Sequence, residues 1–170
     1  RKCISISLIN PVSAPALSGP RAHLSKITSM FYHLSNLLPE AIGGWLLRSP
    51  IAVMIMSSVM AKTSDRKLRG WIHKQHLLNF SDFASVKVAT EGYDASISSD
   101  LSVMAPTIAS PVLIIAATLD DITNIETQRN VVNLYPDAEL VEITGVGHLV
   151  HYEAPSQAAE HISRFIEGTK

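Results

Sequence analysis

Apolar and polar residues alternate near the start of the chain, and the alternation over Ile4–Ile9 predicts a short β-strand. The turn-forming pair Asn10-Pro11 follows it, and a run rich in Ser, Ala, Pro and Gly then extends to residue 20. We therefore interpret residues 1–20 as one strand of a core followed by a linker.

Residues 21–105 show a different pattern, in which apolar residues recur at intervals of three and four. This spacing places them on one face of a helix. Proline and glycine residues, which favour helix ends, divide the zone into several segments. The pattern therefore predicts a helical zone without strands. Its clearest apolar face comprises Leu24, Ile27, Phe31, Leu34 and Leu38.

Strand and helix patterns alternate over residues 106–170. Val112–Ala117 is a continuous apolar run, typical of a strand that is buried on both faces of a parallel sheet. Glu126–Leu134 has the pattern of a helix and Ala138–Ile143 that of the next strand, and a last helix is expected to begin near Pro155. Because this order implies parallel strands joined by helices, the sequence predicts an α/β fold with a parallel sheet.

The composition agrees with a packed core and limits the partners. Of the 170 residues 46% are hydrophobic, and 14 Lys and Arg against 15 Asp and Glu give a net charge of -1. A chain this apolar and this weakly charged is expected to fold rather than to be disordered. Nucleic acids and anionic membranes are bound chiefly by accumulated Lys and Arg. We therefore expect neither of them as a partner.

The sequence also bears on location. The longest apolar stretch, Ala41–Ala61, is interrupted by Arg48 and Pro50, which leaves a segment too short to span a bilayer. The only cysteine, Cys3, excludes an internal disulfide and is expected to be a small buried hydrophobe. No signal peptide is visible, and the chain is expected to begin within a fold. These features favour a cytoplasmic location.

Titratable side chains follow both strands of the alternating region. Asp120 and Asp121 come after Val112–Ala117, and His148 comes after Ala138–Ile143 in a loop that contains glycines. In parallel sheets the carboxyl ends of the strands lie at one edge, so a carboxylate and an imidazole can meet there. A carboxylate that accepts the Nδ1 proton of histidine leaves the other ring nitrogen free to act as a general base. The spacing therefore predicts an acid–base pair.

The stretches Ser110–Asp121 and Ala138–Pro155 resemble the C-terminal part of enzymes of the α/β-hydrolase-fold superfamily. In that family a G-x-x-D turn supplies the catalytic acid and a G-x-G-H turn supplies the catalytic histidine, usually with Glu or Asp before a following Pro. The resemblance implies Asp120 and His148 for these two roles. Ala117 departs from the family pattern, which usually has glycine there, and we expect Asp120 rather than its neighbour to be the acid.

The resemblance also gives roles to the remaining zones. Residues 21–105 lie where the family inserts a helical cap, while residues 1–20 and 106–170 would belong to a partial α/β-hydrolase core. The family's nucleophile stands earlier in the chain, in a G-x-S-x-G turn, and these 170 residues contain no such motif. The resemblance therefore implies the C-terminal part of a hydrolase, inactive by itself, and the hydrophobic residues of the cap favour small apolar esters or related carbonyl compounds as its substrates.

Two alternatives remain open at this stage. Relatives such as haloalkane dehalogenases and epoxide hydrolases use an aspartate nucleophile, and nothing within this chain separates them from esterases. A hydrolase scaffold can also serve as a non-catalytic binding module, in which a partner covers the incomplete edge of the sheet. The oligomeric state is equally open.

Apolar side chains are candidates for contact with a small-molecule substrate. We expect Trp45, Met54 and Met56 of the cap to line an apolar pocket, together with Leu149 beside the catalytic histidine. Ordinary packing between cap helices explains Trp45, Met54 and Met56 equally well. The sequence therefore favours an apolar substrate without identifying it.

Neither a cofactor nor a metal is expected, because the chain has no phosphate-binding glycine loop. His151 and Glu153 follow His148 closely, but no third ligand stands at a suitable spacing. His73 and His76 share one face of a predicted helix. Since no H-E-x-x-H pattern accompanies them, we interpret these two histidines as a packing pair.

Overall fold

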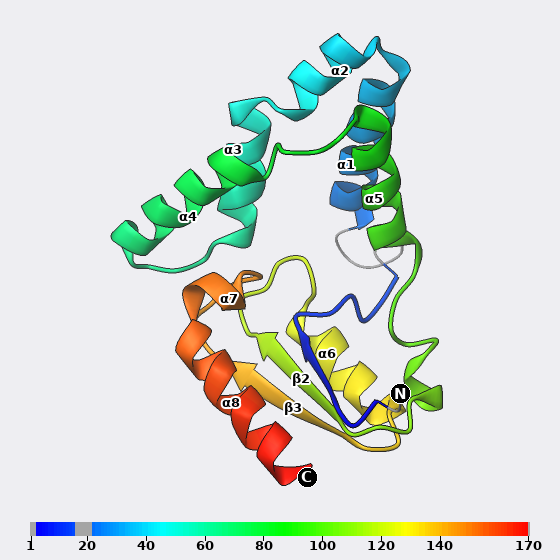
Figure 1. The fold of residues 1–170 in the computed structure, drawn as a ribbon, viewed down its shortest axis with the longest axis vertical. Helices are drawn as coiled ribbons and strands as arrows, with labels where there is room; N and C mark the ends of the chain where they lie inside the picture. Colours follow the sequence, from blue (N-terminus) through cyan, green and yellow to red (C-terminus); the bar gives the residue numbers. More distant parts are fainter. Residues whose placement is uncertain (1–2, 16–21, 170) are drawn as a thin grey trace. The chain divides into compact units, whose positions relative to one another are not determined.

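The computed structural model describes residues 3–15 and 22–169, and these form two compact units. The core unit comprises Arg1–Ala14, Met60–Asp65 and Asp100–Lys170. The helical unit comprises the two intervening segments, Pro15–Val59 and Arg66–Ser99. In Figure 1 the strands belong to the core unit, whereas the helical unit is drawn with helices and their connections.

A three-stranded parallel sheet with the order β1-β2-β3 forms the centre of the core unit. Its strands are β1 (Ile6–Ile9), β2 (Val112–Ala117) and β3 (Ala138–Ile143). The bounds of β2 and β3 confirm the sequence prediction, whereas β1 begins at Ile6 instead of Ile4. Every residue of β2 is fully buried, because this strand lies between the other two and both of its faces are covered.

Helices and short turns cover the sheet of the core unit. Asn124 begins the first of these helices, since its side-chain oxygen accepts a hydrogen bond from the backbone N–H of Glu126 over 2.7 Å. The helix expected over Glu126–Leu134 is an α-helix that ends in a 3-10 turn, two residues before the helix-breaking Pro136. The elements are η1 (Ala105–Thr107), α6 (Ile125–Val131), η2 (Val132–Leu134), α7 (Val150–Glu153) and α8 (Pro155–Gly168).

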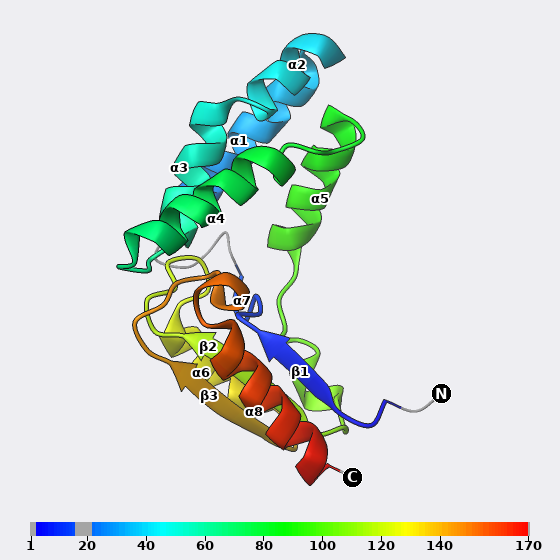
Figure 2. The same cartoon turned by 60° about the vertical axis from the view of Figure 1, so that its left-hand side comes forward.

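Side chains of β2 alternate between the two faces of the sheet, and each face has its own apolar cluster. Leu113, Ile115 and Ala117 pack with residues of α7 and α8. Val112 and Ile114 pack on the opposite face with residues of η1, α6 and η2. Figure 2 shows α8 and α6 on opposite sides of the strands. This two-sided core fixes the positions of the loops at the carboxyl ends of the strands.

The helical unit confirms the prediction of helices for this part of the chain. Among its described residues no strand occurs. The unit ends at Ser99, and Asp100 then accepts a hydrogen bond from the backbone N–H of Ser102 over 2.8 Å as the chain returns to the core. The helices are α1 (Ala22–Leu37), α2 (Glu40–Leu47), α3 (Pro50–Met60), α4 (Arg66–Asn79) and α5 (Val86–Ser98).

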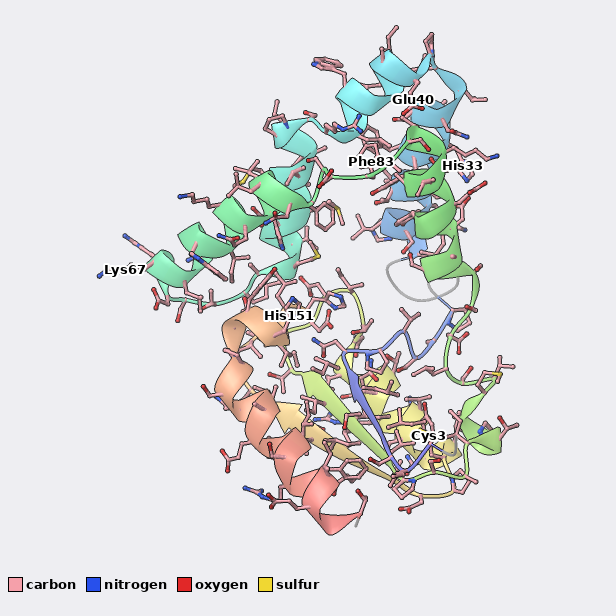
Figure 3. All side chains as sticks on the ribbon, viewed as in Figure 1. Cys3, His33, Glu40, Lys67, Phe83 and His151 are labelled. Carbon is pink, nitrogen blue, oxygen red and sulfur yellow. The ribbon has the colours of Figure 1, made fainter. Side chains whose placement is uncertain are left out.

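Polar and aromatic contacts link α1, α2 and α5. The ring of Tyr32 on α1 stacks on Tyr93 of α5, with 4.8 Å between the ring centroids. Glu40, at the start of α2, accepts a hydrogen bond over 2.9 Å from the backbone N–H of Val86, at the start of α5. Figure 3 marks Glu40 and Phe83 in this unit; the Phe83 ring lies 4.1 Å from the guanidinium of Arg48. These contacts fix the positions of the helices within the unit. The spacing of apolar residues in the sequence does not indicate them.

Two sequence-based expectations require correction. The sequence pattern predicts a single cap over residues 21–105, divided into helical segments, but Met60–Asp65 belongs to the core unit, where its backbone is hydrogen-bonded. Cys3, expected to be buried, is exposed in the short segment that precedes β1 (Figure 3). The zone that lies between β1 and β2 is therefore made of two helical segments with a short core segment between them.

The segment Glu40–Met60 is long and apolar enough to cross a membrane by length and composition alone. An 18-residue window within it has a mean hydropathy of 1.4, and 28% of that window is buried. The structure divides it into α2 and α3, with Arg48 at the end of α2 and Pro50 at the start of α3. Each of the two helices is shorter than the roughly 20 residues that a transmembrane helix needs.

Two glycines on helices of the same unit provide a matched test of its packing. A Cβ atom at Gly43 would overlap the backbone oxygen of Ser35, whereas a Cβ at the exposed Gly70 meets nothing within 4 Å. We expect Gly43→Ala to destabilise the protein by about 1–3 kcal/mol through overpacking. Gly70→Ala should instead stabilise it by up to about 1 kcal/mol through helix propensity. Urea unfolding followed by circular dichroism measures both, and equal effects would contradict the close contact at Gly43.

Candidate active site

The turns after β2 and β3 bring a carboxylate and an imidazole together. Because β2 and β3 are adjacent and parallel, both turns leave the sheet at the same edge. His148 Nδ1 lies 2.8 Å from Asp120 Oδ2. The Asp120 side chain is completely buried, whereas 27% of the His148 side chain is exposed. The pair therefore has one partner shielded from water and the other accessible to a reacting group.

Asp120 is surrounded by hydrogen-bond donors. Its Oδ1 accepts from the backbone N–H groups of Ile122, over 2.7 Å, and Thr123, over 3.0 Å. Its Oδ2 accepts from the Thr123 hydroxyl over 2.5 Å as well as facing His148. Burial by itself raises the pKa of Asp120, but the hydrogen bond and charge of His148 and the hydrogen bonds of Thr123 lower it more, so that the pKa lies below its ordinary value.

The ionised state of Asp120 fixes the tautomer of the histidine. A carboxylate can only accept hydrogen bonds, so Nδ1 of His148 carries the proton that lies between the two side chains. When the imidazole is neutral, its Nε2 therefore has a free lone pair. This is the arrangement that general-base chemistry requires.

The neighbouring carboxylate, Asp121, has a different partner. Its Oδ2 lies 2.7 Å from the ammonium nitrogen of Lys62, in the segment between α3 and α4. The structure thus places Asp120, and not Asp121, against His148. Thr123, which holds Asp120, was not identified from the sequence, although an Asp followed three residues later by Thr is a common signal for a side chain that accepts from a backbone turn.

The backbone of His148 is held from two sides. Its N–H donates to the carbonyl oxygen of Met60 over 3.1 Å, and its carbonyl oxygen accepts from Asn10 Nδ2 over 2.8 Å. A Cβ on the preceding Gly147 would lie 2.5 Å from that same Met60 oxygen. Only glycine therefore allows the Met60–Asp65 segment to approach the histidine loop this closely.

Glu153, at the end of α7, joins the same two segments. Its Oε1 accepts from the backbone N–H groups of Lys62, over 2.5 Å, and Thr63, over 2.8 Å. Its Oε2 accepts from the N–H of Gly147. The family resemblance pointed to this residue, because the family usually has Glu or Asp before the proline that follows the histidine. Nothing in the sequence indicated which backbone groups Glu153 contacts.

The expected substrate-contacting residues lie in both units. Leu149, which follows His148, is buried at the start of α7. Trp45 is 72% exposed on α2, and Met54 and Met56 are partly buried on α3 of the helical unit. The structure does not bring these three residues of the helical unit together with the acid–base pair in one unit, and their contact with a substrate stays a prediction.

The other histidines of interest have structural partners. Ser57 is fully buried on α3, and its hydroxyl lies 2.6 Å from Nδ1 of His73 and 2.7 Å from Nδ1 of His76, both on α4. A serine so buried is inaccessible as a nucleophile. His151, labelled in Figure 3, lies on α7; burial and the nearby charge of His148 lower its pKa. Within residues 3–15 and 22–169, no group of three or more His, Cys, Asp or Glu side chains could hold a metal ion.

Comparison with known proteins gives different results for sequence and for structure. No family model and no curated protein sequence matches the chain. An esterase from Thermogutta terrifontis has a TM-score of 0.71 and 15% identity, over 98% of this chain and 56% of the esterase. MGS-M2, an α/β-hydrolase from a Medee basin deep-sea metagenome library, has a TM-score of 0.69 and 21% identity, over 94% of this chain and 55% of MGS-M2. A bromoperoxidase from Bacillus anthracis has a TM-score of 0.69 and 13% identity, over 96% of this chain and 58% of the bromoperoxidase.

Identities this low indicate a common fold and do not by themselves transfer an activity. The chain spans a little more than half the length of these solved structures. The resemblance carried by residues 110–155 is thereby confirmed at the level of the fold, including the parallel sheet and its flanking helices. These 170 residues form part of an α/β-hydrolase fold.

Proposed function

We propose that Asp120 and His148 are the acid and the base of a nucleophile–histidine–acid triad in a hydrolase of small, largely apolar esters. The observation that carries this proposal is the 2.8 Å contact between His148 Nδ1 and the buried carboxylate of Asp120. Structural neighbours that include an esterase and an α/β-hydrolase support the hydrolase part of this proposal.

In the proposed mechanism the Nε2 atom of His148 takes the proton of the attacking nucleophile and later returns it to the leaving group. Asp120 stabilises the imidazolium that forms in between, and its hydrogen bond keeps the imidazole in the reactive tautomer. Because Asp120 is shielded from water, its charge acts on the imidazolium through a low effective dielectric constant. The hydrogen bond and charge of His148, followed by the hydrogen bonds of Thr123, keep that carboxylate ionised despite its burial.

The nucleophile belongs, in this proposal, to a part of the hydrolase outside these 170 residues. The sequence has no G-x-S-x-G turn, and Ser57, the serine that contacts imidazoles in the helical unit, is fully buried. The same acid–base pair can serve a serine or an aspartate nucleophile. We infer that the 170-residue chain alone has no esterase activity.

An apolar substrate is proposed from the character of the helical unit. Large apolar side chains that are at least half exposed lie on both α2 and α3, and exposed apolar side chains are suited to contact with an apolar ligand. Trp45 is the largest of them, and Met54 and Met56 add flexible side chains that adapt to different acyl groups. The exposed residues of these two helices include Ile42, Trp45, Ile51 and Ile55.

Replacement of the base tests the proposal directly. In a longer reading frame that contains these residues and a nucleophile, His148→Ala should lower kcat for p-nitrophenyl butyrate by about 10²–10⁴-fold, the usual contribution of a general base. His161→Ala on α8 is the matched control and should keep wild-type activity. Full activity in His148→Ala would contradict the proposal.

The 170-residue chain provides a second test of where the nucleophile lies. We expect it to show no hydrolysis of p-nitrophenyl butyrate above the rate of a His148→Ala version of the same chain. A rate that depends on His148 in the isolated chain would instead mean that a nucleophile lies within these residues, and this part of the proposal would be wrong.

The ionisation of Asp120 predicts a dependence of stability on pH. Because the pKa of Asp120 is lowered on folding, its contribution is present above the ordinary aspartate value and is lost as the pH falls through the folded-state value. Asp120→Asn should therefore cost about 1–3 kcal/mol of unfolding free energy at neutral pH. The difference from wild type should shrink below about pH 4. Urea unfolding at several pH values measures it, and a difference that is constant with pH would show that the carboxylate charge contributes nothing.

A further inference from the structure

Asn10 is the first residue after β1, and it has an unusual backbone conformation. Its φ angle is +44°, the one positive value outside glycine among the described residues, and its side chain is buried. Asparagine tolerates this left-handed region better than most residues, but the conformation still needs support from surrounding contacts. Its backbone N–H donates to the carbonyl oxygen of Ile115 over 2.9 Å, and its side-chain amide makes further contacts.

Both ends of the Asn10 amide are hydrogen-bonded, and to different loops. Oδ1 accepts from the backbone N–H of Ala117, the last residue of β2, over 2.8 Å. Nδ2 donates to the carbonyl oxygen of His148 over 2.8 Å and lies 3.4 Å from that of Gly147. The side chain of one residue therefore connects the end of β2 with the loop that carries the histidine.

The connection reaches the acid as well as the base. The carbonyl oxygen of Ala117 accepts from the N–H of Asp120 over 3.3 Å, and this bond closes the turn that presents the carboxylate. The Thr123 hydroxyl, which donates to Asp120, lies 3.4 Å from the carbonyl oxygen of Asn10. Asn10 thus contacts the frame of the Asp120 turn on one side and the backbone of His148 on the other.

We propose that Asn10 is a positioning residue that sets the separation and orientation of Asp120 and His148. It is hydrogen-bonded to neither the carboxylate nor the imidazole ring, and acts through the two loops that carry them. A displacement of either loop by about 1 Å would lengthen the contact between His148 and Asp120, and misplacements of that size can cost about 10²-fold in rate. The consequence for catalysis rests on the proposed function, whereas the effect on the pair does not.

The chemistry of the contacts requires an amide at this position. An aspartate would retain the acceptor for Ala117 but would place a second oxygen against the carbonyl oxygens of Gly147 and His148. A glycine would accept the positive φ angle but would supply neither bond. Asn10→Asp therefore removes only the hydrogen bond to His148, whereas Asn10→Gly removes the hydrogen bonds to both Ala117 and His148.

Gln128 on α6 provides a matched control. It is also a fully buried amide that holds the segment after β1, with Nε2 donating to the carbonyl oxygen of Pro11 over 2.7 Å and Oε1 accepting from Ser13 over 2.6 Å. Its partners belong to the chain that follows Asn10 and not to the loops of the acid and the base. A general loss of stability would therefore affect Gln128→Ala and Asn10→Gly alike, whereas a positioning effect would distinguish them.

The test uses proton NMR of the 170-residue chain. The Nδ1 proton of a histidine hydrogen-bonded to a carboxylate gives a signal at low field, and its absence from Asp120→Asn assigns it to this pair. We expect Asn10→Gly to lose or shift this signal at temperatures where the variant is still folded by circular dichroism, and Gln128→Ala to retain it. Asn10→Asp should behave as Asn10→Gly does, and it replaces that variant if the glycine substitution prevents folding.

Each outcome decides the proposal. An unchanged signal in a folded Asn10 variant overturns the positioning role, and so does equal loss in Gln128→Ala. Absence of the signal from the wild-type chain contradicts the pair itself, and with it both proposals. A lost signal in the Asn10 variants, together with a longer reading frame that has no esterase activity, supports the role of Asn10 and contradicts the proposed function alone.

Discussion

Parallel pairing of the three strands is the constraint on which the rest of the core unit depends. Because β1, β2 and β3 run in the same direction, their carboxyl ends lie at one edge, and the residues that follow them become neighbours. Asn10 follows β1, Asp120 lies in the turn after β2, and His148 lies in the loop after β3. A reversed β3 would carry the histidine to the opposite edge of the sheet, whatever its local sequence.

Burial and hydrogen bonding act together at Asp120. A buried carboxylate without donors takes up a proton and ceases to be an acceptor. Here two backbone N–H groups, one hydroxyl and one imidazole offset the loss of water, so that the charge persists in a shielded position. The same residues that stabilise the folded turn therefore determine the tautomer of His148. The hydrogen bonds that stabilise the Asp120 turn are thus also the ones that prepare His148 to act as a base.

The parts of this arrangement that could be predicted from the sequence are those with a local signal. The apolar run of β2 and the loop around His148 are each visible within about ten residues, and the order of the elements places them side by side. Asn10, Lys62 and Glu153 make their contacts with residues far away in the chain, and no local pattern indicates which backbone groups they meet. The exposure of Cys3 has the same origin, because it depends on which elements pass over the start of β1.

The position of Met60–Asp65 has a consequence for how this fold can be rearranged. An insertion is usually regarded as a cassette with two junctions, here near Ala14 and Asp100, that can be exchanged between related proteins. This insertion has a third attachment in its middle, where Glu153 holds the backbone of Lys62 and Thr63. A chimaera that exchanges everything between the two outer junctions would remove the Met60–Asp65 segment, to which Glu153 and the N–H of His148 are hydrogen-bonded. Successful recombination would have to keep this middle segment with the recipient core and exchange only the helices on either side of it.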